Sequence, residues 1–400
     1  MKFFPLFSFL MLTMFFMAAC GTRQSQIKVG GSPYVDPDTM QRDEIIHLPT
    51  GTALTRPELF KLLANERIVY IGEGHDNIYD HQVELEVVKN LYQRFPERLA
   101  VGFEMLAHVN QEKVDQWLAG ELSEDDFIRL FAGDWSMAEF VYYREIFAFL
   151  KSYRIPVRAL NVSRHEKMVF MREMKSSDQG GNALENPPQS VIEDPYQKQA
   201  LQAMFAGHVE GHGDLGMFLK VHQLWEENMA ETIAAYLDSP DGDGKLLVVI
   251  AGGFHVIRGY GLPRRVFQRK KVPYCVLLTH TPEALIENER RTMDVDFPEL
   301  PLYLGDYLWC VPYRNLKDQQ ARLGVGLKGA DKGIGIVMVE AGSVAEKHGL
   351  AVGDLIINCA GDELDDPLDL SLLLLKKHKG EVVELLIERD GKLQNIEVLL

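Results

Sequence analysis

Four carboxylate or imidazole side chains follow short apolar runs, at positions where buried strands would end. Glu73 and His75 follow one run, Glu104 follows a second, and His255 follows a third. These groups could bind a divalent or ferrous ion, or they could transfer protons during hydrolysis, with Glu73 or Glu104 as the general base. No His-Glu-x-x-His motif in the sequence identifies a metal. Each residue alone could also be a helix cap or a partner of a backbone carbonyl.

The surrounding sequence alternates apolar runs with amphipathic segments. Amphipathic stretches such as 80–95 and 134–153 predict helices. Five apolar runs predict strands that are buried on both faces: 67–71, 99–103, 157–160, 246–251 and 272–278.

This alternation predicts an α/β domain at 45–300, with a mainly parallel sheet and flanking helices. Residues 190–237 lack a strand pattern and predict a helical insertion. Ligands of parallel α/β sheets bind at the carboxyl ends of the strands, so the four side chains should converge on one rim.

Composition and charge limit the classes of partner. The chain has 400 residues, of which 46% are hydrophobic and 25% charged, as expected for a globular protein with two domains. Its formal net charge of -16 excludes DNA and RNA as partners, because nucleic-acid phosphates would be repelled. The sequence leaves open whether the chain forms a homodimer.

The first twenty residues are typical of an export signal. A lysine precedes a run of Phe, Leu and Met, and the small residues Ala18 and Ala19 come directly before Cys20. This arrangement resembles the bacterial lipobox and implies cleavage before Cys20 and lipidation of its sulfur. An uncleaved membrane anchor or a plain signal peptide is the alternative. We therefore expect an exported, membrane-anchored lipoprotein of the bacterial cell envelope, in the outer membrane, with a flexible tether at 21–44.

Short motifs recur in a fixed order between residues 45 and 281. They are VYIGEGHDN from Val69, GFEM from Gly102, QLW from Gln223, and GGFH from Gly252 with GYGLP after it. In this order they resemble the ChaN-like domain, a family within the wider Tiki and erythromycin-esterase-like grouping.

The resemblance implies an iron-regulated lipoprotein that binds haem and acts in iron uptake. More distantly, it implies a relation to metal-dependent proteases and hydrolases. The metal ligands of that wider group would here be Glu73, His75, Glu104 and His255. One departure from the family pattern is Glu226-Glu227, where an Asp is usual.

Haem binding would require an apolar slot and an axial ligand. The helical insertion offers Tyr196, His208 and His212 as candidate ligands. The segment from His208 to His212 could instead be a solvated helix end with glycine breakers.

The last part of the chain is a separate unit that follows a predicted linker at 301–320. The sequences GIGIVMVEAGSVAEKHGLAVGDLIINCAGDEL and GEVVELLIERDGKLQNIEVLL resemble a bacterial PDZ domain, a small β-rich α+β fold, over 321–400. In PDZ domains a peptide adds a strand beside the second strand, and its terminal carboxylate binds loop amides. The loop would here consist of Arg322, Leu323, Gly324 and Val325. A purely structural domain is the alternative.

Two functions therefore remain open. A non-enzymatic haem- or iron-binding protein, with a PDZ domain that binds a partner peptide, is the interpretation we favour. A metal-dependent hydrolase, with a PDZ domain that recruits polypeptide substrate, is the alternative. Both functions use the same rim and differ in what occupies it.

Overall fold

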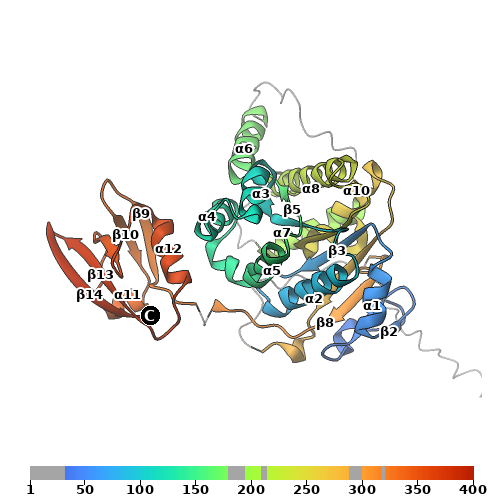
Figure 1. The fold of residues 1–400 in the computed structure, drawn as a ribbon, viewed down its shortest axis with the longest axis horizontal. Helices are drawn as coiled ribbons and strands as arrows, with labels where there is room; N and C mark the ends of the chain where they lie inside the picture. The colour runs from blue at the N-terminus through green and yellow to red at the C-terminus, as the bar shows by residue number, and fades with distance from the viewer. Residues whose placement is uncertain (1–31, 179–193, 209–213, 288–299, 318–319) are drawn as a thin grey trace, which may run out of the picture.

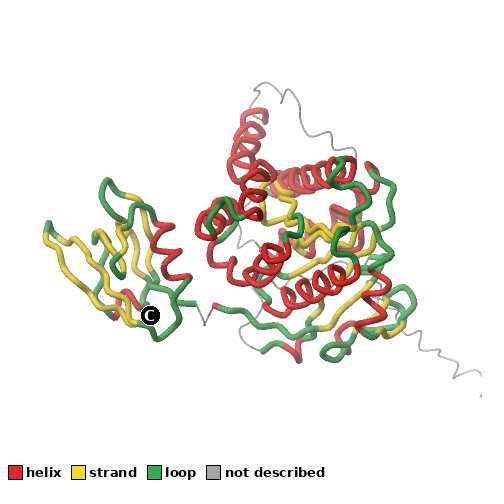
Figure 2. The backbone as a smooth tube through the Cα atoms, viewed as in Figure 1, coloured by secondary structure: helices red, strands yellow, loops and turns green. Residues whose placement is uncertain are grey.

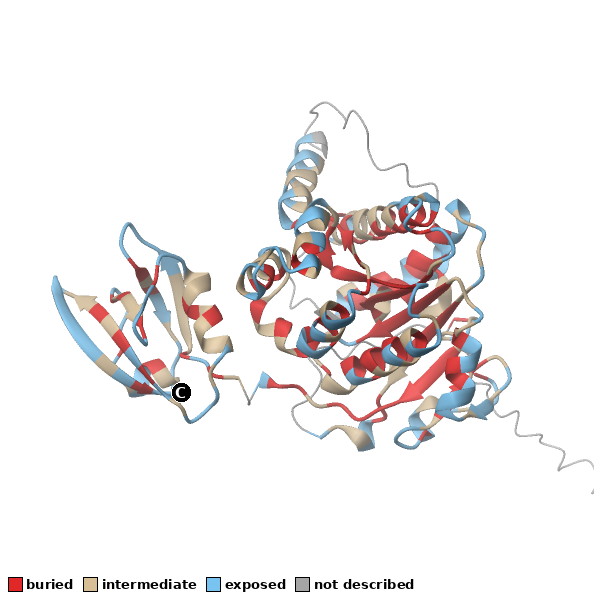
Figure 3. Ribbon diagram, viewed as in Figure 1, coloured by how far each residue is buried: buried red, intermediate tan, exposed pale blue. Residues whose placement is uncertain are grey.

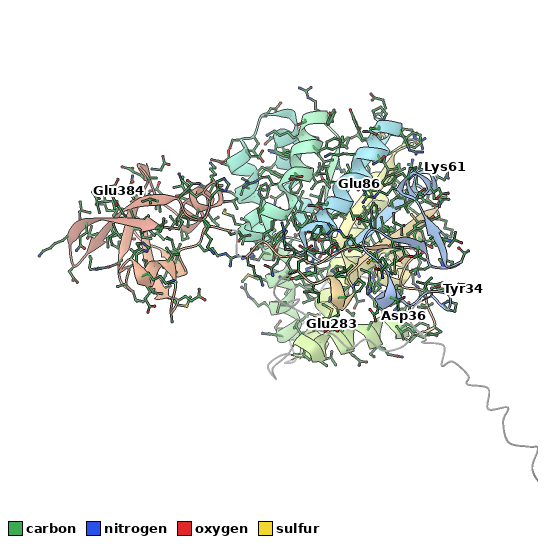
Figure 4. All side chains as sticks on the ribbon, turned by 90° about the horizontal axis from the view of Figure 1, so that it is seen from below. Tyr34, Asp36, Lys61, Glu86, Glu283 and Glu384 are labelled. Atoms are coloured by element: carbon green, nitrogen blue, oxygen red, sulfur yellow. The ribbon has the colours of Figure 1, made fainter. Side chains whose placement is uncertain are left out.

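The chain folds into two domains, each built on its own sheet (Figures 1 and 2). The computed structural model describes residues 32–178, 194–208, 214–287, 300–317 and 320–400, so the predicted signal and Cys20 lie outside the described residues. In Figure 4 the labelled Glu86 marks the larger α/β domain, and Glu384 marks the smaller C-terminal domain.

The larger domain contains an eight-stranded sheet in the order β2-β1-β8-β7-β3-β6-β4-β5. The six strands from β8 to β5 pair in parallel, whereas β1 and β2 pair antiparallel at one edge. The predicted α/β class with a mainly parallel sheet is confirmed. The strands are β1 (Ile45–His47), β2 (Thr52–Leu54), β3 (Ile68–Glu73), β4 (Leu99–Ala107), β5 (Val157–Asn161), β6 (Leu246–Gly252), β7 (Tyr274–His280) and β8 (Tyr307–Cys310).

Helices cover both faces of this sheet, which explains why its central strands are continuous apolar runs (Figure 3). One face packs on α1 (Arg56–Leu63), α2 (Ile78–Arg94), α3 (Gln111–Ala119), α4 (Glu124–Asp134) and α5 (Phe140–Tyr153). The other face packs on α8 (Leu215–Asp238), α9 (Gly253–Val256) and α10 (Leu262–Arg269).

The predicted insertion is helical in its described part, with α7 (Pro195–His208) and α8. The helix α6 (Arg164–Asp178) follows β5 and extends away from the body of the domain (Figure 1). Among the described residues, no helix combines the length and the apolar character that crossing a membrane requires.

The predicted linker at 301–320 is wrong in its first half. Residues Tyr307–Cys310 form β8, which lies between β7 and β1 in the sheet, and Trp309 is buried. Proline on both sides of this run suggested a connector, but its four apolar residues bury well between two strands.

The predicted tether at 21–44 is likewise wrong in its described part. The Ser32 hydroxyl donates to the Leu48 carbonyl at 2.7 Å, and Met40 is buried against the sheet. The chain is therefore attached to the domain from residue 32 onward.

The C-terminal domain is a mainly antiparallel sheet in the order β14-β13-β11-β10-β9, with β12 beside β11 and a core of its own. The hairpin predicted at Asp390-Gly391 is present, and both residues have the positive φ that a two-residue hairpin turn needs. Its elements are β9 (Val325–Gly329), β10 (Ile334–Val339), α11 (Val344–Lys347), β11 (Leu355–Cys359), β12 (Asp362–Glu363), α12 (Pro367–Leu375), β13 (Val382–Arg389) and β14 (Lys392–Leu399).

Candidate functional site

The carboxyl ends of β3, β6 and β4 are neighbours in the sheet, and they bring the four predicted side chains together. In the ladder between β3 and β6, Glu73 lies opposite Gly252, and Phe103 of β4 pairs with Ile250 on the other side of β6. We call Glu73, His75, Glu104 and His255 the rim cluster. Three of them are almost fully buried, whereas the side chain of His75 is 33% exposed.

Glu73 and His75 form an ion pair. The Nδ1 atom of His75 lies 2.7 Å from Oε1 of Glu73, and the Tyr143 hydroxyl donates to the same oxygen at 2.7 Å. Burial alone would lower the pKa of His75, but the Glu73 carboxylate outweighs burial and raises this pKa to about 9. The ring of Trp135 packs edge-on against His75 with the centroids 5.0 Å apart.

Glu104 and His255 form a second ion pair, with 3.2 Å between Oε1 and Nε2. The backbone N–H of Gly252 donates to Oε2 of Glu104 at 2.7 Å. Burial would raise the pKa of Glu104, but the adjacent His255 lowers it to about 2. Burial would lower the pKa of His255, and the Glu104 carboxylate instead raises it to about 10.

A glycine allows the two pairs to approach each other. A Cβ atom on Gly252 would lie 2.8 Å from Nε2 of His75 and 3.5 Å from the Glu104 carboxylate. Any side chain at this position would therefore push His75 away from Glu104.

The rim cluster continues into a buried group on α2 that sequence reasoning missed. The imidazole of His81 lies 3.0 Å from Glu84 and 3.5 Å from Glu73. Burial alone would lower the pKa of His81, but Glu84 outweighs burial and raises it to about 10. The sequence does contain a pattern that could have predicted this group. His81 and Glu84 are spaced i, i+3, so they lie on the same side of the predicted helix, and this side also carries the buried residues Val83, Val87 and Val88.

On its other side the rim cluster continues into α8. Glu226 lies 3.3 Å from both His255 and the guanidinium of Arg265, and it accepts hydrogen bonds from the Gln197 amide. Burial would raise the pKa of Glu226, but His222, His255 and Arg265 lower it well below its usual range. Glu226, where the family pattern usually has an Asp, therefore belongs to this network of buried charges. Its neighbour Glu227 instead pairs with Arg269 at 2.6 Å.

Two groups of buried side chains have ligand atoms close enough to hold a metal ion: His222, Glu226 and His255, and separately Glu73, His81 and Glu84. The Arg265 guanidinium already neutralises Glu226, so the first group suits a cation poorly. In the second group, Oε2 of Glu73 and Oε1 of Glu84 have no hydrogen-bond partner within the described part of the chain. The two free carboxylate oxygens of the second group fit a divalent cation better, and His81 would join them as a ligand once it releases the proton that Glu84 and Glu73 stabilise.

A hollow of about 650 Å³ lies beside the rim, between α3, α4 and α6. A narrower mouth, lined by Glu104, Trp135 and Trp225, adjoins it through Asp134 and Arg164. The hollow has the volume of a small-molecule site. Its lining combines three cationic groups, two carboxylates, an imidazole and apolar side chains, contributed by Lys113, Arg129, Arg164, Asp126, Asp134, His165, Leu130 and Met168.

Tyr196, one of the haem-ligand candidates from sequence, is not among the residues that line this hollow. Tyr196 lies in the first turn of α7 and is 37% exposed. His208 is the last residue of α7, but its side chain is not among those described, and His212 lies outside the described residues.

In the C-terminal domain, the predicted peptide-binding loop leads into β9, the last strand of its sheet. Leu323 is buried, and Gly324 has a φ of +74°. Their carbonyl groups accept backbone hydrogen bonds from Ala345 and Glu340 at 2.8 and 2.9 Å. The loop is therefore anchored through its carbonyls, beside a strand that has one unpaired edge within the described sheet.

Residues 59–266 match the family described as "Haem-binding uptake, Tiki superfamily, ChaN". The chain belongs to this family. A solved structure described as cofacial heme binding to ChaN of Campylobacter jejuni aligns over 69% of this chain and 100% of that chain, with a TM-score of 0.51 and 15% sequence identity. At this identity the likeness shows a shared fold.

Residues 321–400 match the PDZ domain, as the sequence predicts. They are 41% identical over 75 residues to the serine protease Do-like HtrA of Bacillus subtilis (strain 168), covering 18% of this chain and 17% of that protease. The HtrA3 PDZ domain bound to a phage-derived ligand (FGRWV) aligns over 20% of this chain and 85% of that chain, at 18% identity and a TM-score of 0.19. The chain thus spans about a sixth of the length of the curated protease it matches.

The ion pairs of the rim cluster predict how stability depends on pH. The folded-state pKa values of His75 and His255 are raised above 6.5 to about 9 and about 10, so their stabilisation is complete below pH 6.5. It is lost as the pH rises through 9 to 10. We therefore expect the free energy of unfolding in urea to fall between pH 6.5 and 10.

A His255→Gln variant should show a shallower fall over the same range, because one of the three imidazoles with a raised pKa, His75, His81 and His255, is gone. An equal slope in the variant and the wild type would contradict the assignment of the raised pKa to His255.

Proposed function

We propose that this chain is an exported, lipid-anchored haem-binding protein of iron uptake, whose PDZ domain binds a partner peptide. The match of residues 59–266 to a family described by haem binding and uptake carries the proposal. The hollow beside the rim supports it, because its chemistry suits haem.

Haem combines a flat apolar ring with two carboxylates and an iron that takes an axial ligand. In the hollow, Leu130 and Met168 offer apolar contact to the ring. Arg129 and Arg164 offer cations to the carboxylates. His165 offers an imidazole to the iron. Tyr196, the candidate that the sequence predicts, lies outside this hollow and would bind the iron only of a haem placed elsewhere.

Titration of haemin into residues 21–400 should produce a saturable shift of the Soret band. An Arg164→Gln variant should bind haemin about fivefold more weakly or worse, because a charge-assisted hydrogen bond to a carboxylate is lost. Arg172→Gln is the matched control, since Arg172 is an exposed arginine of the same helix that does not line the hollow.

The axial ligand is distinguished by the position of the Soret band in His165→Ala and Tyr196→Phe. Equal affinity of the two arginine variants would place haem outside the hollow. No spectral shift in any of these proteins would remove haem binding altogether.

Lipid anchoring is part of the proposal and rests on the small residues before Cys20 and the apolar run that precedes them. A Cys20→Ala variant expressed with its own leader should move from the membrane fraction to the soluble fraction. Equal recovery of variant and wild type in the membrane fraction would contradict lipidation at this residue.

Peptide binding is supported by the anchored loop at 322–325 and by the unpaired edge of β9 in the described sheet. Peptides with a free terminal carboxylate should bind, and their amidated forms should bind at least about tenfold more weakly, because the loop amides then lack an anion. Fluorescence polarisation with a peptide library measures this difference. Equal affinity for the free and the amidated peptides would contradict carboxylate recognition by the loop and would favour a purely structural role for the domain.

A second function, metal-dependent hydrolysis, is favoured by the convergence of the rim cluster beside the mouth. The residues that would hold a divalent cation are Glu73, His81 and Glu84, whose carboxylates each have an oxygen without a hydrogen-bond partner in the described structure. Such a cation would supply a Lewis acid at the rim. Glu104 and His75 would then hold or move a proton near the mouth.

A further inference from the structure

The helix α12 of the PDZ domain carries leucines on two opposite faces, together with the polar residues Asp369 and Ser371. Leu370, Leu373 and Leu374 pack into the core of the PDZ domain. Its opposite face, formed by Leu368, Leu372 and Leu375, packs into the core of the ChaN-like domain, and Leu372 is only 4% exposed. A helix with apolar residues on two opposite faces is one that packs against a partner on each side. The run of leucines in this helix is therefore explained by contact with both domains. Figure 1 shows α12 on the side of the PDZ domain nearest α4.

Polar contacts hold the same helix against the ChaN-like domain. Arg129 of α4 donates to Asp369 at 2.5 Å, and Lys376 donates to Asp125 at 2.7 Å. The Gln320 amide, just before the peptide-binding loop, donates to the Ala138 carbonyl at 2.8 Å. These contacts flank the leucine face and fix its position on α4. We call the set of polar and leucine contacts the dock.

The docked helix is also one wall of the peptide groove. Val325 and Leu327 of β9 and Leu373 and Leu374 of α12 are partly buried in the same core. A peptide added beside β9 would lie against α12. Binding of the peptide therefore depends on a helix that the ChaN-like domain holds in place.

Arg129 connects the dock to the hollow. Its guanidinium pairs with Asp369 of α12, and the same residue lines the hollow in which we place haem. The Arg129 guanidinium can therefore pair either with Asp369 or with a carboxylate of a ligand that occupies the hollow. Both side chains of the pair are partly exposed, at 34% and 20%, so the exchange is not blocked by burial.

We propose that occupancy of the hollow by haem and docking of the PDZ domain compete for Arg129, so that loading of haem loosens the attachment of α12, one wall of the peptide groove, to the ChaN-like domain. This inference rests on the proposed haem function. Coupling between two sites is reciprocal, and haem therefore loosens the dock by the same factor by which the dock weakens haem binding.

The variant Asp369→Asn tests the competition from the PDZ side, because it removes the competing carboxylate without altering the hollow. It should bind haemin about two- to fivefold more tightly than the wild type, as expected for a partly exposed ion pair. Glu384→Gln is the matched control. It removes one negative charge from an exposed position of the same domain, on β13 and outside the contacts of the dock, and it should leave haemin affinity unchanged (Figure 4).

Hydrogen exchange on the wild-type chain, residues 21–400, tests the same coupling without any variant. Saturation with haemin should accelerate amide exchange in 368–375 about two- to fivefold relative to the haem-free protein. This measurement keeps the inference testable if Asp369→Asn fails to fold.

The outcomes separate the two proposals. If haemin binds but neither the Asp369→Asn affinity nor the exchange of α12 changes, the coupling is wrong and the haem function stands. Equal tightening by Asp369→Asn and Glu384→Gln would show a general charge effect and would also overturn the coupling. If haemin binds to none of the proteins, the haem function fails, and the coupling fails with it.

Discussion

The structure depends on the adjacency of β3, β6 and β4 in one parallel sheet. Because these strands end at the same edge, Glu73, Glu104, His75 and His255 are forced into contact away from most of the solvent. A buried carboxylate or imidazolium is costly without a partner, and each of these groups has one. The two ion pairs hold these side chains in place at the carboxyl edge of the sheet. The hollow and its mouth lie beside this edge.

Much of this arrangement could be predicted from sequence, because strands buried on both faces are continuous apolar runs whose ends are marked by polar residues. The convergence of Glu73 and His255 follows from that pattern and from the rule that parallel strands share one carboxyl edge. The strand β8 was missed, since four apolar residues between prolines do not distinguish a strand from a connector. The hollow could not be predicted, because α4 and α6, which line it, are separated by α5 and β5 and meet only in the folded domain.

In the PDZ domain, too, contacts between segments far apart in the sequence could not be predicted from the sequence. Its fold and its hairpin are visible in the sequence, but the run of leucines in α12 could be attributed only to a core. The structure shows that this helix serves two cores, and that Arg129 belongs both to the dock and to the hollow. Contacts between residues 240 positions apart leave no local pattern that periodicity could detect. Through this shared arginine, the haem site and the peptide groove that we propose would be coupled.

The central claim is that haem, and not a metal ion alone, is the ligand of the ChaN-like domain. The most direct test is to purify residues 21–400 from cells supplied with haem and to measure haem and total metal in the same sample. The account predicts stoichiometric haem, a Soret band, and no metal beyond the iron of the haem. Stoichiometric zinc, manganese or iron without haem, lost in His81→Ala, would contradict it and would favour the metal-dependent hydrolase.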